Sequence, residues 1–251
     1  KAEEMDIDLE KTRSGIKDFV KRICSLSKEN IVALKEGFSR SKAFGYLLHD
    51  IQVLNFLKFR SCSINYFVKN VEQMVKESGR ELGLDIFSPS LSWLVGQDYS
   101  LLKDNCSWMK PMIYCTALGA ACLPAEITCL ARDFQKLNTK LSDNDLIYMI
   151  SHFLESPLQY KDLNEMKLKG LPEELVRLET ARAKEAVEGK VPIYTGIEAV
   201  VTDICSISPE RSESYVKHAI EGGADGIILS WDIKLVPIEN LKAIKKTLDL
   251  S

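Results

Sequence analysis

The sequence predicts an α/β fold with a parallel sheet, and two observations support this. Four short apolar segments, each ended by proline, glycine or polar residues, have the length of buried strands. The stretches between them carry apolar residues at a helical period of about 3.6. Strands that alternate with helices pair in parallel through helical crossovers, because a parallel neighbour can be reached only by a long connection.

The first 80 residues are predicted to be helical. Residues 8–26 form an amphipathic helix with apolar side chains on one face. Residues 43–78 form the longest helical stretch, with a break expected near residues 61–63. Gly79 follows as a C-cap, because glycine readily adopts the left-handed conformation that ends many helices.

The remaining chain alternates between strand and helix signals. Serine, aspartate and proline mark helix starts, and the pair Gly222-Gly223 marks a helix end. The predicted strands are 84–89, 108–114, 190–197 and 224–231. The predicted helices are 99–102, 124–137, 142–154, 172–187, 208–222 and 237–248.

This pattern predicts the C-terminal half of a (β/α)8 TIM-barrel-like fold, because a complete barrel has twice as many strands as this chain offers. Residues 1–80 would supply crossover helices, and residues 81–251 the half-barrel with a helical insertion at about 116–188. The chain opens without methionine, inside a charged helical segment, which is what a fragment or a processed chain would show.

Composition argues against several classes of function. Apolar residues make up 45% and charged residues 27% of the chain, with no apolar run of about 18 residues, so no membrane contact is expected. The net charge is −3 without a basic block, so nucleic acid is not expected as a partner. Seven cysteines without CxxC spacing predict free thiols and a cytoplasmic location. The three histidines share no metal-ligand spacing, and no phosphate-binding glycine motif occurs, so neither metal nor cofactor is expected.

Candidate functional residues follow from the rule that such folds carry function on the loops after their strands. Glu198, behind Gly196 at a strand end, is the candidate catalytic carboxylate; the structural alternative is a solvated side chain or one paired with a nearby Lys or Arg. Polar and aromatic residues form the candidate substrate-binding set: Arg60, Asn65, Ser88, Ser90, Trp93, Tyr114, Trp231 and Asp232.

Some of these candidate residues could have a structural role instead of a binding role. Trp93 and Trp231 could stack on a sugar ring or simply pack at the rim. Asp232 could bind a hydroxyl or cap the following turn, and capping is the usual role of an aspartate there. Arg60 could reach an inward carboxylate or remain a surface charge.

Several motifs resemble a family of bacterial glycoside-hydrolase-like proteins with a (β/α) barrel. They are Phe59-Arg60, Ser63–Val68, Asp85-Ile86-Phe87-Ser88-Pro89 and Ser107-Trp108-Met109-Lys110-Pro111-Met112-Ile113-Tyr114. Val191–Glu198 resembles the seventh strand of that family and Gly226–Trp231 the eighth. The resemblance implies glycosidase chemistry on two carboxylates, with Glu198 at the position of the nucleophile. The acid/base of that family follows strand four, which this sequence lacks.

The sequence therefore predicts one of two functions. The first is a glycoside hydrolase, and the alternative is a non-catalytic carbohydrate-binding or assembly module. A lyase or aldolase is disfavoured, because Lys110 lies too early in its strand for a Schiff base. Because a half-barrel leaves two open sheet edges, we expect either a homo-oligomer or pairing with a missing N-terminal half.

Overall fold

The structure, a computed structural model, describes residues 7–25 and 50–249. Its centre is a four-stranded parallel sheet in the order β1-β2-β3-β6. The strands are β1 (Gly83–Phe87), β2 (Trp108–Met112), β3 (Tyr194–Glu198) and β6 (Gly226–Ser230). Each overlaps a predicted strand, so the prediction of a parallel α/β fold is confirmed. The described residues form an open sheet with β1 and β6 at its edges, and no closed barrel.

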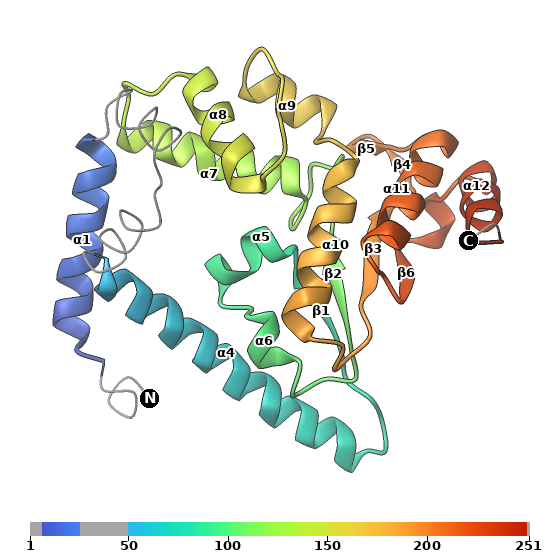
Figure 1. The fold of residues 1–251 in the computed structure, drawn as a ribbon, viewed down its shortest axis with the longest axis horizontal. Helices are drawn as coiled ribbons and strands as arrows, with labels where there is room; N and C mark the ends of the chain where they lie inside the picture. Colours follow the sequence, from blue (N-terminus) through green and yellow to red (C-terminus); the bar gives the residue numbers. More distant parts are fainter. Residues whose placement is uncertain (1–6, 26–49, 250–251) are drawn as a thin grey trace.

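Helices flank this sheet, and α10 lies across it (Figure 1). The helices and turns are α1 (Leu9–Ser25), α4 (Ile51–Glu77), α5 (Pro89–Ser92), η2 (Trp93–Val95), α6 (Tyr99–Leu102), α7 (Leu123–Leu137), α8 (Asp143–Leu154), α9 (Leu163–Lys169), α10 (Glu174–Val187), α11 (Pro209–Glu221), η3 (Ile233–Leu235) and α12 (Ile238–Asp249). A short antiparallel hairpin, β4 (Val201–Thr202) and β5 (Cys205–Ser206), follows β3. In the part of the chain that is described, no helix is both long and apolar enough to cross a bilayer.

The sheet consists of two strand pairs with a narrow join. Strands β1 and β2 pair along their whole length, and so do β3 and β6. Between β2 and β3 the ladder is short, with Met112 opposite Gly196 and an isolated bridge from Met109 to Ile193. We call this join the seam.

Helices bury the centre of one face of the sheet. Met109, Thr195 and Ile197 have no exposed surface. The hydroxyl of Thr195 lies 2.9 Å from that of Thr180 on α10, which places this helix directly against the sheet. The helix α10 therefore serves as the crossover between β2 and β3, although it falls inside the predicted insertion.

The opposite face carries the alternate side chains of each strand, as the pleat requires. Asp85 is exposed on this face, and Trp108 and Tyr194 are half-buried, with ring centroids 5.8 Å apart. A side chain at Gly83 would overlap the Trp108 ring, so glycine is needed there to let the indole lie across β1. On this face the large Trp108 side chain thus lies over the small residue of the neighbouring strand.

The N-terminal helices depart from prediction at one point. Helix α4 runs unbroken from Ile51 to Glu77, so the expected break near residues 61–63 is wrong. Ser and Cys lower helix propensity only slightly, and Ile64 and Val68 hold the helix against the smaller of two hydrophobic cores. Gly79 follows α4 with φ of +69°, as predicted for a residue that ends a helix. The rest of the predicted helical segment, residues 1–6 and 26–49, lies outside the described residues.

The helices between β2 and β3 follow their sequence signals closely. Ser142 and Asp145 form a capping box at the start of α8, where the helix is predicted to begin. Helix α9 is not predicted, although Asp162 caps it by accepting a hydrogen bond from the Glu165 amide at 2.7 Å. Its single pair of buried apolar residues, Leu163 and Met166, is too short a pattern to read as a helix.

Candidate functional site

The carboxyl ends of β2 and β6 bring two aromatic side chains together. Tyr114 and Trp231 stack nearly parallel, with ring centroids 6.0 Å apart and an interplanar angle of 10°. Trp231 is 49% exposed, whereas Tyr114 is 6% exposed. The peptide bond between Ser230 and Trp231 is cis. We call this stacked pair the aromatic platform.

Tyr114 keeps its proton at neutral pH. Burial raises the pKa of its phenol, and the nearby Lys110 ammonium and Ser230 hydroxyl offset this only in part. The platform is therefore uncharged and carries a hydroxyl that can donate a hydrogen bond.

An ion pair lies on the same face of the sheet, next to the platform. The Lys110 ammonium is 2.8 Å from an oxygen of Asp85 and 6.0 Å from the centroid of the Tyr114 ring. The Lys110 side chain is 10% exposed and that of Asp85 is 54% exposed. A Cβ at Gly196 would lie 2.9 Å from Cε of Lys110, so glycine at this position makes room for the lysine stem.

Lys110 remains charged in this position. Burial favours its neutral form, but the hydrogen bond to Asp85 and the nearby Tyr114 outweigh burial, and the pKa of Lys110 is raised. A lysine that acts as a nucleophile needs a lowered pKa, so this geometry does not suit a Schiff base. Neither member of the pair stands among the predicted site residues.

Glu198 occupies the end of β3 and has no exposed surface. Its carboxylate accepts backbone hydrogen bonds from Cys115 at 2.9 Å, Thr116 at 3.0 Å and Ala117 at 2.5 Å. These amides belong to the loop after β2, so the carboxylate bridges the two strand pairs across the seam. Both structural alternatives for Glu198, a solvated side chain or a Lys or Arg pair, are wrong, because its partners are backbone amides.

The chemistry of Glu198 follows from its enclosure. Burial raises the pKa of the carboxyl group to about 7, against the three amide donors that favour the charged form. A carboxyl group with this pKa is partly protonated at neutral pH and could act as a general acid, provided that a substrate reaches it.

Ser88 and Ser90 are held away from the platform by a buried carboxylate. Glu179 on α10 accepts hydrogen bonds from both serine hydroxyls and from the Ser90 amide at 2.8 Å. Arg182 completes this cluster by donating to Glu179. Both serines therefore fix the start of α5 against α10. No local sequence signal points to Glu179 as a partner of the serines, since Ser88 and Ser90 are about ninety positions away along the chain.

The remaining predicted residues are distributed among structural contacts. Arg60 donates to the carbonyl oxygen of Leu94, and Asn65 accepts a hydrogen bond from Asn105 at 2.9 Å. Asp232 accepts from the Lys234 amide at 3.0 Å and caps η3, in line with the capping interpretation.

Trp93 lies in a different part of the molecule from the platform. It lines an apolar groove of about 510 Å³ formed by α1, α4, η2, α7 and α8. Its indole N–H donates to the carbonyl oxygen of Ser90 at 2.8 Å. The structure thus unites Tyr114 and Trp231 at the strand ends and places Trp93 elsewhere.

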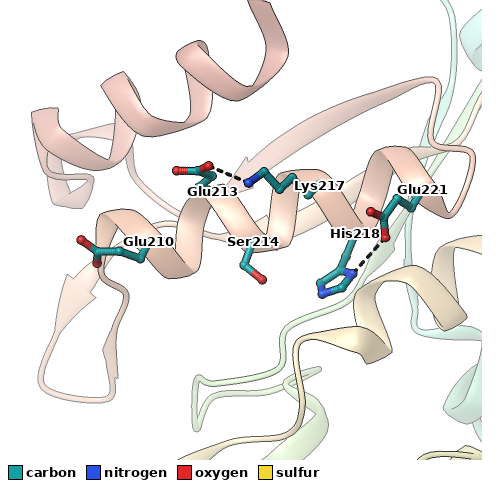
Figure 2. Close-up of a pocket in the computed structure, with 6 residues that line it drawn as sticks. All are labelled: Glu210, Glu213, Ser214, Lys217, His218 and Glu221. Carbon is teal, nitrogen blue, oxygen red and sulfur yellow. Dashed lines mark ion pairs between the residues drawn. The ribbon is translucent and has the colours of Figure 1, made fainter. Parts of the chain in front are cut away.

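A shallow hollow of about 360 Å³ lies along α11 (Figure 2). All six lining residues belong to that one helix: Glu210, Glu213, Ser214, Lys217, His218 and Glu221. Lys217 pairs with Glu213 at 2.7 Å, and His218 approaches Glu221 at 3.3 Å. These are contacts along a single helix surface, so we assign this hollow no catalytic role.

The described residues contain neither a candidate metal site nor a disulfide bond. Within residues 7–25 and 50–249, no group of three or more His, Cys, Asp or Glu side chains could hold a metal ion. All seven cysteines lie in these ranges and are free thiols, as predicted.

Comparisons of the chain with protein-family models, curated proteins and solved structures find no match.

Proposed function

We propose that this chain belongs to a glycoside hydrolase of (β/α)-barrel type and binds a carbohydrate at the carboxyl ends of its strands. The aromatic platform carries the proposal. Its exposed indole offers a flat apolar surface, and such surfaces pack against the apolar face of a sugar ring. The Lys110 ammonium and the Ser230 hydroxyl lie beside the Tyr114 phenol of the same platform.

The architecture supports the barrel part of this proposal. The four parallel strands are ordered along the sheet as they are in the sequence, and helices cover one face. The other face carries alternating large and small side chains, and strands β1 and β6 each present an unpaired edge within the described residues. Closing such a sheet into a barrel would satisfy both edges.

Hydrolysis would use carboxyl groups near the platform. Glycosidases need two of them, one acting as an acid and the other as a base or a nucleophile. Glu198 matches the nucleophile position of the resembling family. Because its carboxyl group is enclosed by the loop at 115–117, catalysis through Glu198 requires that loop to move.

A non-catalytic carbohydrate-binding module is the second candidate, and the enclosure of Glu198 favours it. The Glu198 carboxylate has three backbone donors and no exposed surface, so its role in joining the strand pairs at the seam explains its position without catalysis. In this case the platform binds sugar and no bond is cleaved.

A glycan array probed with the intact chain tests the binding step. We expect Trp231→Ala to lower affinity about tenfold, which corresponds to roughly 1.4 kcal/mol. Trp93→Ala is the matched control, because Trp93 is 41% exposed but lies away from the platform. The proposal fails if no glycan binds, or if both substitutions have the same effect.

Hydrolysis of aryl glycosides and of the bound glycans then separates the two candidates. Turnover that is lost in Glu198→Gln while glycan binding persists supports the hydrolase. Binding without turnover by the unmodified chain supports the module and rejects hydrolysis by this chain.

A further inference from the structure

We infer that the apolar groove between α1, α4, η2, α7 and α8 binds one long-chain carboxylic acid, with the acyl chain in the groove and the carboxylate at Arg60. The groove does not include the aromatic platform, so it is a site separate from the proposed carbohydrate site. Its volume is about 510 Å³. Sites for small molecules commonly have volumes of about 300–1,000 Å³.

The deepest residues of the groove belong to the main hydrophobic core. Four lining residues on α7 and α8 are more than nine-tenths buried: Ile127, Ala131, Leu146 and Ile150. Their side chains have no hydrogen-bonding groups, and a polar ligand atom beside them would lose its contacts with water without replacement. This part of the groove therefore suits a hydrocarbon chain.

Aromatic side chains line the same groove and remain exposed. Phe56, Trp93 and Phe153 each keep more than a third of their surface accessible to water. The indole N–H of Trp93 is already bonded to the Ser90 carbonyl, so the ring offers the groove only apolar surface. Exposed apolar surface that gathers at one place marks a binding site, because a ligand that covers it removes that surface from water.

Arg60 is the only charged residue among the described residues that line the groove. One terminal nitrogen donates to the carbonyl oxygen of Leu94, and the guanidinium carbon lies 5.8 Å from the centre of the Phe56 ring. Leu94 and Phe56 also line the groove, so the guanidinium group lies at its wall. Leu94 uses one of five N–H donors, and the described residues provide no acidic partner for Arg60.

The walls of the groove are fixed by contacts that need no ligand. Arg132 on α7 binds both carboxylate oxygens of Asp143 at the start of α8, at 2.7 and 3.0 Å. The Asn138 side chain after α7 donates to the Ile23 carbonyl of α1 at 3.0 Å. A Cβ at Gly96 would lie 3.1 Å from the α4 backbone, so glycine lets the chain after η2 lie close to α4. The site is therefore formed before a ligand arrives.

The single guanidinium group determines the class of head group. A carboxylate carries one negative charge at neutral pH and matches the planar N–H pair of arginine. A phosphate monoester carries about two charges at pH 7, and the groove offers one cation. A neutral lipid would leave the remaining N–H donors of Arg60 without a charged partner. A fatty acid matches both the charge and the apolar wall.

Isothermal titration of the intact chain with saturated fatty acids tests this inference. The series runs from about 8 to 14 carbons, below the concentrations at which micelles form, because each buried CH₂ contributes about 0.8 kcal/mol. We expect the dissociation constant to fall about fourfold for each added methylene until the groove is filled. Absence of binding at every chain length would overturn the inference.

Replacement of Arg60 tests the position of the carboxylate. We expect Arg60→Gln to weaken binding of the fatty acid about tenfold and to leave binding of the alcohol of equal length within about twofold. Arg13→Gln is the matched control, because Arg13 lies on α1 in an exposed pair with Glu10 and does not line the groove. Equal effects on the acid and the alcohol, or no effect on either, would overturn the assignment of Arg60.

A larger side chain in the groove tests the position of the acyl chain. Met149 on α8 is a half-buried lining residue, and we expect Met149→Trp to fill the groove and weaken binding at least tenfold. Leu130→Trp makes the same test from α7, and circular dichroism with thermal unfolding establishes which variants are folded. If folded variants bind the fatty acids as the unmodified chain does, the acids bind elsewhere and the inference fails.

Discussion

Replacement of Glu198 by glutamine tests the buried carboxyl group at the seam. The carboxyl group is fully buried, and burial raises its pKa from 4.5 to about 7. This difference corresponds to about 3 kcal/mol between the folded and unfolded chains, at ~1.4 kcal/mol per pH unit. Glutamine keeps the size of the side chain but has no charge to lose.

The sign of the pH dependence follows from linkage. Below pH 4.5 the carboxyl group is protonated in both states, so its contribution to stability is fully present. Between pH 4.5 and about 7 the unfolded chain releases the proton while the folded chain retains it, and stability falls as pH rises. Above this window the loss is complete.

Urea unfolding followed by circular dichroism measures the effect across the same pH window. The free energy of unfolding of the unmodified chain, minus that of Glu198→Gln, should fall by about 3 kcal/mol from pH 4.5 to above 7. The glutamine amide also meets a backbone N–H, which adds a pH-independent cost of about 1–3 kcal/mol to the variant. A difference that stays constant, or grows with pH, would refute the reasoning, since the three amides would then hold the carboxylate charged.

Three further substitutions, and Gly119→Ala as a control for one of them, test packing and hydrogen bonding by the same unfolding measurement. Asn240→Ala removes buried bonds to two backbone carbonyls, each 2.8 Å long, and should cost about 2 kcal/mol; a neutral result would contradict this. Gly196→Ala should cost about 1–3 kcal/mol, whereas Gly119→Ala, whose added atom would have no neighbour closer than 3.8 Å, should stay within about 0.5 kcal/mol. Glu179→Ala strips Arg182 and two serines of their buried partner and should cost about 3–5 kcal/mol, and a loss below about 1 kcal/mol would show that the cluster is dispensable.

The fold was largely predictable because its signals are local. Each strand is a short apolar run with a clear stop, and the helices at 99–102 and 209–221 begin at Asp98 and Ser208, whose side chains cap them. The structure adds what local signals do not contain. Helix α9 and the hairpin β4–β5 are too short to show a period.

The candidate site was predictable only where the backbone alone decides position. Tyr114 and Trp231 follow β2 and β6, the parallel strands on either side of β3, so the strand-end rule places both at the carboxyl end of the sheet. Ser88 also follows a strand, but its hydroxyl donates to Glu179, which is distant in the sequence, and so does not face the platform. The sequence does not predict that Lys110 pairs with Asp85, because both residues lie within strands and the pairing register is visible only in three dimensions.

The seam has a consequence for how the molecule opens. The β1–β2 ladder and the β3–β6 ladder each close over a short stretch of chain, whereas Met112 meets Gly196 only after four intervening helices have been placed. Chain entropy makes such a distant contact late to form and early to break. Amide hydrogens of Cys115, Thr116 and Ala117 should therefore exchange with solvent sooner than those inside either ladder. Because all three donate to Glu198, the strength of these hydrogen bonds determines the difference in exchange rate.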